Sequence, residues 1–327
     1  MGARDNLLIH LKSSMGEWVS GELLSTKLDV SRAAISKHVR TLRKQGYEID
    51  SRPRKGYLLT SVPDLLLPNE IREGLDTRVF GQKEIVCLQH TDSTNLDARR
   101  LAEEGAPEGT VVVADTQTAG RGRKGRSWYS PPGFGIYTSI ILRPAISPAD
   151  APRITLLTAV AIAEALLELT DIDIRIKWPN DILANGKKAA GILTEIRTEM
   201  DMVDYIVVGL GLNVNTPDDQ FEELLKPIAT SLFIESGEKF PRVKIIQTCL
   251  KWFERCYESA GATGFAPVID RWKALSKIIG QKIEIDVAGR IHSGRVKDVD
   301  NAGVLVMLDD HGKERRFFSG DVTMRPT

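Results

Sequence analysis

The sequence predicts an α+β protein of several domains, and three observations support this. Residues 1–62 have helical periodicity and helix-capping residues, followed by a hairpin pattern. Strand-like and helix-like segments mix over residues 63–277, and residues 278–327 hold only short strand-like runs with glycine turns. A chain of 327 residues is long enough for two domains, or for three if one or two are small.

Composition narrows the class of protein. With 42% hydrophobic and 27% charged residues, the chain is close to the average soluble globular protein, which argues against a disordered, collagen-like or coiled-coil protein. No run of about 18 apolar residues could cross a membrane, and the N-terminus lacks a secretory signal. Cys87, Cys249 and Cys256 are too few for a disulfide framework and form no Cys-x-x-Cys pair. We therefore expect a cytoplasmic protein with no membrane partner and no protein-bound metal.

The net charge of zero conceals an uneven distribution of charge. Residues 1–62 hold 11 Lys or Arg and 6 Asp or Glu, a net charge of +5. The remaining residues hold 33 basic and 38 acidic side chains, a net charge of −5. A basic segment joined to a mildly acidic one suggests a polyanion-binding module fused to a domain with another task.

The first 62 residues indicate three short helices. Residues 5–14 form an amphipathic stretch, and Ser20 and Ser31 stand where capping residues begin helices over residues 21–28 and 32–45. In the third helix, apolar residues recur at spacings of four and three, which predicts one buried face with the basic residues off it. The second and third helices, joined by a tight turn, form a helix-turn-helix pattern.

A hairpin pattern after the third helix strengthens this prediction. Two strand-like runs, at residues 47–51 and 56–60, are joined by a basic turn at residues 52–55, which would place a wing beside the helix. The alternative is a basic helix that only faces solvent, but with the wing we favour DNA binding. Residues near the start of the helix would face base edges, and those of the turn would meet phosphates. The candidates are Ser31, Arg32, Ser36, Lys37, Arg40, Arg52, Arg54 and Lys55.

Strands and helices mix after a proline-containing linker at residues 62–68. Asn185-Gly186, between two strand-like arms, predicts a hairpin. From residue 278 onward the pattern indicates a small β-barrel. We expect strands at 83–90, 109–117, 133–144, 172–178, 181–196 (the hairpin) and 205–215, and helices at 151–170, 241–259 and 265–276.

The segment GRGRKGRSW, residues 120–128, is the most unusual in the chain. Its glycines satisfy G-x-G-x-x-G, but a dinucleotide-binding loop needs a helix that opens at the glycines and an acidic residue about 20 positions later. Here SWYSPPG follows, and no Asp or Glu occurs between Thr116 and Ala149. A Walker loop is also excluded, because no G-K-[ST] is present.

What remains is a glycine-containing loop with four cationic side chains. Glycines let backbone N–H groups approach an anion, and Arg grips carboxylate or phosphate with two donors. The alternatives are a solvated basic loop and a second contact with nucleic acid. Because the loop interrupts strongly apolar strands and has no acidic neighbours in sequence, we favour a site for an anionic ligand. The four cations are Arg121, Arg123, Lys124 and Arg126.

A second group of candidates lies in the segment KWPNDILANGKK. Trp178 could stack on an aromatic ligand, although a Trp-Pro pair at a strand end is more often a packing feature. Asn180 and Asp181 offer polar groups at the end of the strand. Lys187 and Lys188 are adjacent on a strand, so their side chains point to opposite faces and only one can enter a site.

A third group, DSTN at Asp92 to Asn95, places two hydroxyls and an amide at the start of a helix that continues to Leu101. A simple helix N-cap is the more common reason for such residues. A ligand-binding role is the alternative.

In this order, these motifs closely resemble those of biotin protein ligases of the bifunctional type that also act as the biotin operon repressor. The resemblance covers essentially the whole chain. GRGRKGRSW followed further along by KWPND is a highly specific pairing, whereas the helix-turn-helix alone would be generic. The motifs that carry the resemblance are SRAAISKHVRTLR, DSTN, QTAGRGRKGRSW, KWPND, GKKAAGIL, GLGLNVN and GRIHSGRVKDVDNAGVLVML.

The resemblance implies a winged helix-turn-helix domain over residues 1–62 and, over residues 63–277, a ligase domain with the fold of class II aminoacyl-tRNA synthetases. An SH3-like barrel would occupy residues 278–327. The implied reaction has two steps. The carboxylate of biotin attacks the α-phosphate of Mg-ATP to form biotinyl-5′-AMP and pyrophosphate. A lysine amine of a biotin carboxyl carrier protein domain then attacks the mixed anhydride and releases AMP. ATP and Mg²⁺ are thus the implied cofactors, and biotin is the implied substrate.

The resemblance also assigns residues to roles. Lys188, rather than Lys187, directly precedes the Ala-Ala-Gly-Ile run, so its ammonium would bridge the biotin carboxylate and the α-phosphate; Arg121 and Arg123 complete the implied catalytic set. The implied biotin and biotinyl-AMP residues are Ser93, Thr94, Asn95, Gln117, Arg121, Gly122, Arg123 and Lys188. The implied ATP-binding residues are Arg126 for phosphate, Trp178 for adenine stacking, Asn180 and Asp181 for phosphate and metal, and Asn213 for the nucleotide.

In repressors of this type, bound biotinyl-AMP favours a homodimer that places two recognition helices on a palindromic operator, and the carrier protein competes for the same ligase-domain surface. Lipoate and octanoate ligases share the ligase fold, but those families lack the GRGR-x-G loop followed by Trp and lack the winged head. A transcription factor that only senses a small molecule would not need Lys188. Residues 1–62 could also be a structural remnant in an enzyme that regulates nothing. Only the charge of the third helix and of the wing argues against that reading.

Overall fold

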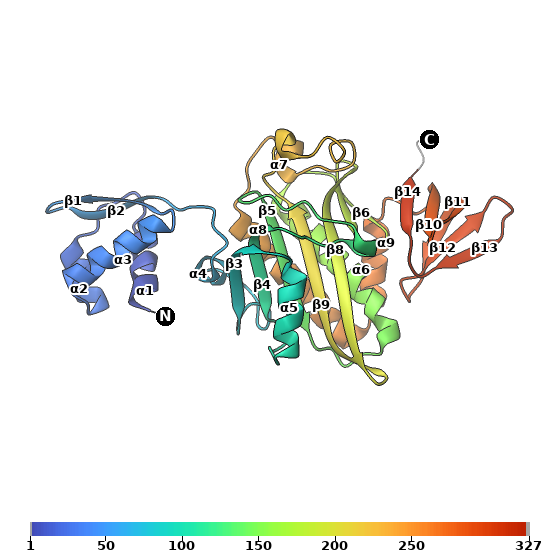
Figure 1. Ribbon diagram of the computed structural model, residues 1–327, viewed down its shortest axis with the longest axis horizontal. Coiled ribbons are helices and arrows are strands. Elements are labelled where there is room, and N and C mark those ends of the chain that lie inside the picture. The colour runs from blue at the N-terminus through green and yellow to red at the C-terminus, as the bar shows by residue number, and fades with distance from the viewer. Residues whose placement is uncertain (1, 325–327) are drawn as a thin grey trace. The chain divides into compact units, whose positions relative to one another are not determined.

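The computed structural model describes residues 2–324 of the chain (Figure 1). Internal contacts divide the chain into two compact units, Met1–Leu65 and Leu66–Thr327. The first unit therefore extends slightly beyond the domain predicted for residues 1–62. The boundary predicted between residues 277 and 278 falls inside the second unit. Over the residues described, no helix is both long and apolar enough to cross a bilayer.

The first unit has the predicted order of three helices and a hairpin. Its elements are α1 (Ala3–Ser13), α2 (Gly21–Leu28), α3 (Arg32–Lys44), β1 (Glu48–Arg52) and β2 (Gly56–Ser61). Ser20 Oγ accepts a hydrogen bond from Leu23 N, and Ser31 Oγ accepts one from Ala34 N, so both predicted N-caps are confirmed. The apolar stripe of α3 is buried, as its periodicity predicts. This leaves the polar face of α3 available for a partner.

A seven-stranded mixed sheet is the centre of the second unit. The strand order is β3-β4-β5-β9-β8-β7-β6; β3 and β4 pair in parallel, and the other neighbours pair antiparallel. The predicted strands are all present, and Asn185 and Gly186 form the predicted turn with φ values of 48° and 90°. The strands are β3 (Ile85–Thr91), β4 (Val111–Gln117), β5 (Gly135–Leu142), β6 (Ile174–Lys177), β7 (Asp181–Ala184), β8 (Lys187–Glu199) and β9 (Met202–Asn213).

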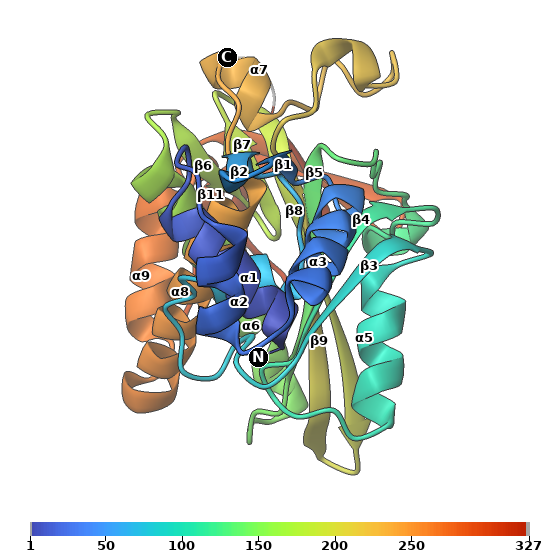
Figure 2. The same cartoon turned by 90° about the vertical axis from the view of Figure 1, so that its left-hand side faces the viewer.

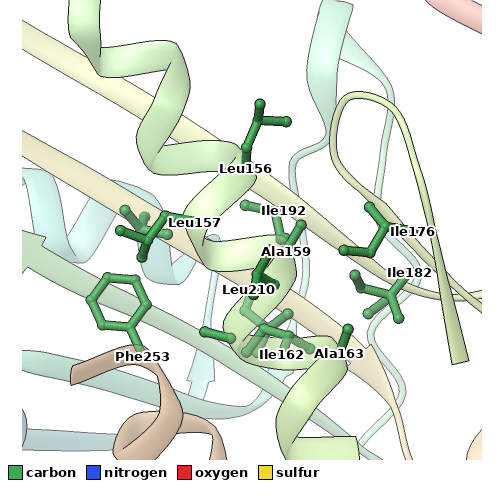
Figure 3. Close-up of a cluster of buried hydrophobic side chains, with 14 of the residues drawn as sticks. Leu156, Leu157, Ala159, Ile162, Ala163, Ile176, Ile182, Ile192, Leu210 and Phe253 are labelled. Atoms are coloured by element: carbon green, nitrogen blue, oxygen red, sulfur yellow. The ribbon is translucent and has the colours of Figure 1, made fainter. Parts of the chain in front are cut away.

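Helices cover both faces of this sheet (Figure 2). The three long helices α6 (Ala151–Leu169), α8 (Arg242–Thr263) and α9 (Ala266–Leu275) share the main hydrophobic core with one face, whereas α5 (Thr94–Glu103) packs on the other. Figure 3 shows α6 side chains such as Ile162 against Ile192 and Leu210 of the sheet. Further short helices are α4 (Pro68–Arg72), which begins at the last residue of the predicted linker, and α7 (Leu232–Ser236); three-residue 3₁₀ turns occupy Arg123–Gly125, Pro148–Asp150 and Asp218–Gln220.

The last region is a five-stranded antiparallel sheet. Its strands are β10 (Lys282–Val287), β11 (Arg290–Val299), β12 (Leu305–Asp309), β13 (Glu314–Phe317) and β14 (Asp321–Met324), in the order β13-β12-β11-β10-β14. The closed barrel that was predicted is not formed by the described strands, because β13 and β14 are its two edges. Ile283, Ile285 and Val296 belong to the same hydrophobic core as α6 and α9. This shared core joins the last sheet to the rest of the second unit and brings β14 to the site described below.

Candidate active site

One pocket of the second unit collects most of the predicted site residues, although they come from six different elements and loops. Its wall is formed by the start of α5, the end of β4, the loop of residues 118–130, the turn before β7, strands β7, β8 and β9, and Asp321 of β14. The predicted residues in this wall are Ser93, Thr94, Asn95, Gln117, Arg121, Gly122, Arg123, Arg126, Asn180, Asp181 and Lys188.

Neutral polar groups form one end of the pocket. Gln117 Oε1 accepts a hydrogen bond from Thr94 N at 3.0 Å, and Gln117 Nε2 donates to Ser130 Oγ at 2.9 Å. Ser139 Oγ lies 2.8 Å from Thr94 Oγ1 and 2.7 Å from Asn95 Oδ1. Each of these polar groups is therefore held in one orientation before a ligand arrives.

The DSTN segment does more than begin a helix. Ser93 occupies the N-cap position of α5, yet its side chain makes no capping hydrogen bond. Thr94 and Asn95 are buried at the pocket wall rather than turned to solvent. The simple N-cap alternative thus does not account for these residues.

The arginine loop is a compact hairpin-like turn. Gly122 N donates to Arg126 O at 2.7 Å, and Trp128 N donates to Gly120 O at 2.8 Å. Lys124 has a positive φ of 55° at the tip. The backbone of the loop therefore folds on itself, and the cationic side chains are left to make contacts outside the loop.

Those side chains meet oxygen atoms from distant parts of the chain. Arg121 Nη1 lies 3.3 Å from Glu195 Oε1, and Arg123 Nη1 donates to Asn180 Oδ1 at 3.2 Å. Lys124 Nζ and Arg126 Nη2 lie 3.1 and 2.5 Å from Asp321 Oδ2. The prediction that the loop faces an anion is consistent with this arrangement, in which protein carboxylates already occupy part of the cationic surface.

Two pKa shifts describe the electrostatics around the arginine loop, which forms the charged end of the pocket. Burial lowers the pKa of Arg123, and Asp321 and Asp181 oppose that effect. Burial alone would raise the pKa of Asp321, but the hydrogen bond from Lys124 and the charges of Arg126, Lys124 and Arg123 outweigh it and hold the pKa below its usual value. A dense group of cations is therefore the dominant feature of this end.

Glycines of the sheet leave room for the Trp128 side chain to pack against the backbone. A Cβ atom at Gly211 would overlap the indole ring, and one at Gly191 would come within 3.0 Å of it. Gly209 similarly leaves room for the Asn95 side chain. The GLGL segment is therefore required for close approach of side chains that line the pocket.

Lys188 lines the pocket. Its Nζ is 2.7 Å from Asp181 Oδ1 and 5.3 Å from the centre of the Trp128 ring. Lys187 points the other way, is exposed, and reaches Lys226 O at 3.4 Å. Of the two adjacent lysines, the structure places Lys188 and not Lys187 in the pocket, as strand geometry requires.

Two predicted nucleotide-binding residues lie elsewhere. Trp178 is 1% exposed, belongs to the hydrophobic core, and donates from Nε1 to Gly303 O at 3.2 Å. Asn213 is also buried, and its Nδ2 donates to Thr230 O at 2.9 Å. The prediction that Trp178 stacks on adenine does not fit this position, since both side chains are engaged in packing or hydrogen bonding within the protein. The position of Trp178 instead favours the alternative named for a Trp-Pro pair, a packing feature at a strand end.

Sequence reasoning missed several residues of the pocket. Asp321 and Glu195 hold the loop cations, and Trp128, Ser130 and Ser139 shape the wall. The absence of acidic residues near the loop in sequence gave no sign that carboxylates from β8 and β14 would pair with it.

A protein-bound metal cluster is not present among residues 2–324, where no group of three or more His, Cys, Asp or Glu side chains could hold an ion. Asp181 is a carboxylate at the charged end of the pocket. Mg²⁺ is commonly held by one or two carboxylates together with substrate phosphates. The donor set therefore fits a magnesium ion that arrives with a nucleotide.

The first unit has a polar hollow between α3 and the hairpin. The residues that line it include the predicted candidates Arg32, Ser36, Arg40, Arg52 and Arg54. Ser31 caps α3 beside it, and Lys37 follows Ser36 on the same helix. The remaining candidate, Lys55, lies with Arg52 over the ring of Trp18, at 6.0 and 5.2 Å from its centre.

Comparison with known proteins agrees with this geometry. Residues 86–213 match the model of the biotin/lipoate A/B protein ligase family, and residues 4–58 match a helix-turn-helix domain model. The second unit thus has the catalytic domain of the biotin and lipoate ligase class, and the first unit has a helix-turn-helix domain.

Relatives along the whole chain make the assignment narrower. The bifunctional ligase/repressor BirA of Bacillus spizizenii is 43% identical over 318 residues, which cover 97% of each chain. The BirA of Escherichia coli K12 is 32% identical and covers 95% of this chain and 94% of its own length. The structure of the Aquifex aeolicus biotin protein ligase in complex with biotin and ATP covers 75% of this chain and 100% of its own, with a TM-score of 0.64 and 28% identity. The chain belongs to the bifunctional biotin ligase/repressor family.

Proposed function

We propose that the pocket of the second unit joins biotin to the α-phosphate of ATP and then passes the biotinyl group to a lysine of a biotin carboxyl carrier protein domain. The observation that supports this most directly is that Lys188 lines one pocket together with the neutral hydrogen-bonding groups and the cations of the arginine loop. The neutral end offers hydrogen-bonding groups for an uncharged ring, and the charged end offers cations for phosphates.

Adenylation brings a carboxylate onto a triphosphate, so like charges must be brought together. The Lys188 ammonium would bind a biotin carboxylate oxygen and an α-phosphate oxygen, which lowers their repulsion as the new bond forms. Arg121 and Arg123 would hold the biotinyl-AMP phosphate, with Gly122 leaving room for the approach of backbone N–H groups. Arg126 would exchange Asp321 for phosphate oxygens.

The neutral end would fix biotin. Ser93, Thr94, Asn95 and Gln117 present hydroxyl and amide groups that are already oriented by one another. Asn180 and Asp181 would face the phosphates, and Asp181 would also meet Mg²⁺, which neutralises phosphate charge when bound.

Transfer needs a nucleophile from outside the chain. The ε-amine of the carrier lysine would attack the biotinyl carbonyl, the bond to the AMP phosphate oxygen would break, and AMP would leave with the electron pair. The Lys188 ammonium would again face the phosphate oxygen on which charge develops.

Incubation with ATP, Mg²⁺ and either biotin or lipoate, followed by mass analysis of the adenylate retained, tests this proposal. We expect biotinyl-AMP from the wild type and about 10²–10³-fold slower formation with Lys188→Ala, because a cation at the reacting centre is lost. Lys187→Ala is the matched control, since Lys187 is the adjacent but exposed lysine, and it should behave as wild type. Lipoyl-AMP would move the substrate to the neighbouring family, and biotin retained without adenylate would contradict ligase activity.

The repressor role concerns the first unit. The polar face of α3 would enter the major groove of operator DNA, with Ser31, Arg32, Ser36, Lys37 and Arg40 near base edges. The hairpin cations Arg52, Arg54 and Lys55 would meet phosphates. Support comes from the charge of this unit and from its helix-turn-helix match.

Occupancy of the ligase pocket would control DNA binding through self-association. Bound biotinyl-AMP would favour a homodimer, and the carrier protein would compete for the same surface. Sedimentation of the protein with and without biotinyl-AMP measures this directly. Equal self-association in the two states would contradict the coupling.

We further propose that the protein acts in the cytoplasm. We also relate its last five strands to SH3-like barrels, on the basis of the number and the antiparallel order of those strands.

A further inference from the structure

A second lysine stands beside the reacting lysine of the pocket. Lys177 ends β6, and Asp181 begins β7 directly opposite it in the antiparallel register. The Asp181 carboxylate therefore lies between two ammonium groups: Oδ1 is 2.7 Å from Lys188 Nζ, and Oδ2 is 4.0 Å from Lys177 Nζ. The longer distance is beyond hydrogen bonding, so the shared carboxylate leaves Lys177 incompletely neutralised.

Lys177 is also held away from bulk water. Its side chain is 24% exposed, and burial lowers its pKa, an effect that Asp181 opposes and Lys188 reinforces. An ammonium in this position gains from an additional anion, since desolvation and a neighbouring cation both disfavour its charged form.

The charges around Lys177 do not balance. Five cationic side chains gather around two carboxylates, Asp181 and Asp321, an excess of three positive charges among the residues described. The five cations are Arg123, Lys124, Arg126, Lys177 and Lys188. A ligand with several negative charges on adjacent groups, such as a polyphosphate, matches this excess.

The charged neighbours of Lys177 place it beside the phosphate-binding part of the site. Lys177 lies behind the wall of the pocket, and the four charged groups that act on it, those of Asp181, Lys188, Asp321 and Arg126, all line the pocket. In a phosphoryl transfer, the attacking and leaving oxygens lie roughly in line, on opposite sides of the phosphorus. With biotin at the neutral end, the leaving group departs towards Lys177.

We propose that Lys177 binds the β- and γ-phosphates of ATP and stabilises the departing pyrophosphate, as a partner of Lys188 held across Asp181. This inference rests on the adenylation chemistry proposed above. As the biotin carboxylate oxygen bonds to the α-phosphorus, the bond from that phosphorus to the bridging β-phosphate oxygen breaks, and pyrophosphate leaves with the electron pair. No proton is required, because the total charge of biotin and ATP equals that of biotinyl-AMP and pyrophosphate. The role of Lys177 is confined to this half of the reaction.

Half-reactions separate this role from a structural one. For Lys177→Met, we expect kcat/KM for ATP in adenylation to fall by about 10²-fold, as for the loss of one charge-stabilising donor. Pyrophosphate added to enzyme-bound biotinyl-AMP should regenerate ATP with a raised apparent KM for pyrophosphate. Transfer from preformed biotinyl-5′-AMP to a carrier domain involves no pyrophosphate, so it should stay within about twofold of the wild type.

Two further variants complete the test. Lys187→Met removes a lysine that is exposed on the opposite face and should leave both half-reactions unchanged. Lys177→Arg keeps the charge and should recover part of the adenylation rate. The inference is wrong if Lys177→Met adenylates like Lys187→Met, or if its transfer rate falls as far as its adenylation rate, since the residue would then act by supporting Lys188 or the fold. Failure of the wild type to form biotinyl-AMP at all would instead overturn the proposed function.

Discussion

The two ends of the pocket differ in how their polar groups are satisfied. At the neutral end, Thr94, Asn95, Gln117 and Ser139 bond to one another and to the backbone within the protein. Asn95 also donates to Glu195, the carboxylate that pairs with Arg121. At the charged end, the cations of the arginine loop pair with carboxylates from separate strands, among them Asp321. Neutral groups thus form a pre-built surface, whereas the charged groups hold partners that a phosphate can replace.

The two ends of the pocket should therefore serve different purposes in ligand binding and in catalysis. A fixed network of neutral groups rejects ligands that cannot match its donors and acceptors, which gives specificity. Cations paired with exchangeable carboxylates keep their charge in a partly buried site until the phosphates arrive. We therefore expect substitutions at the neutral end to change biotin affinity and those at the charged end to change reactions of ATP.

Among the substitutions that compare the two ends, the largest effect is expected from one that displaces Trp128, which lines the pocket directly after the arginine loop. Gly211→Ala would add a Cβ that overlaps the indole ring, which would displace both Trp128 and the arginine loop that precedes it. Overpacking of this kind costs about 1–3 kcal/mol, and we expect both biotin affinity and adenylation to fall by at least about tenfold.

Calorimetric biotin binding and adenylate retention measure both effects for Gly211→Ala. Gly261→Ala is the control, because no atom lies within 4 Å of the added Cβ in α8. If the Gly211 variant lost ATP reactions but bound biotin normally, Trp128 would belong to the charged end alone.

An intermediate effect is expected at the neutral end. Ser139 is fully buried, and its hydroxyl lies between Thr94 and Asn95. Ser139→Ala leaves buried partners without a hydrogen bond, which costs about 1–3 kcal/mol. We expect weaker biotin binding with little change in the KM for ATP.

Calorimetry of biotin binding and steady-state kinetics measure both effects. Ser259→Ala is the control, because Ser259 is an exposed serine of α8. An equal rise in the biotin Kd and the KM for ATP would show that the two ends of the pocket are not independent.

The smallest effect is expected for the stability that Asp321 supplies. Its carboxyl pKa is held below the ordinary value of 3.8, so the charged form favours the folded state. That contribution is complete well above pH 3.8 and is lost as the pH falls through the lower folded-state value. Since the ion pairs are partly exposed, Asp321→Asn should reduce stability by no more than about 1 kcal/mol at neutral pH.

Chemical denaturation of the wild type and Asp321→Asn between neutral and acidic pH follows this contribution. The difference in midpoint should shrink as the pH falls. A difference that grew in acid would mean that the protonated carboxyl, not the carboxylate, favours the folded state.

Local features of the fold could be predicted because they depend on neighbouring residues. The caps at Ser20 and Ser31 and the turn at Asn185-Gly186 need only short-range hydrogen bonds or a positive φ. The choice of Lys188 over Lys187 was also local, since adjacent side chains on a strand face opposite ways.

Predictions that depended on distant contacts were less successful. Trp178 was expected to stack on a ligand, yet Gly303, more than a hundred positions later, accepts its hydrogen bond and helps to bury it. The last five strands were expected to close into a barrel, but they remain an open sheet whose apolar side chains join the core of α6 and α9.

The family, the two functional modules and the positions of the arginine loop and Lys188 could be predicted from the sequence, because each depends on a continuous motif or on the alternation of a single strand. The carboxylates that face those cations could be found only from the folded structure. Glu195, Asp181 and Asp321 come from three different strands, and their meeting depends on strand order and on the packing of the last sheet. Charge interactions act through space, so their partners are set by the fold rather than by proximity in sequence.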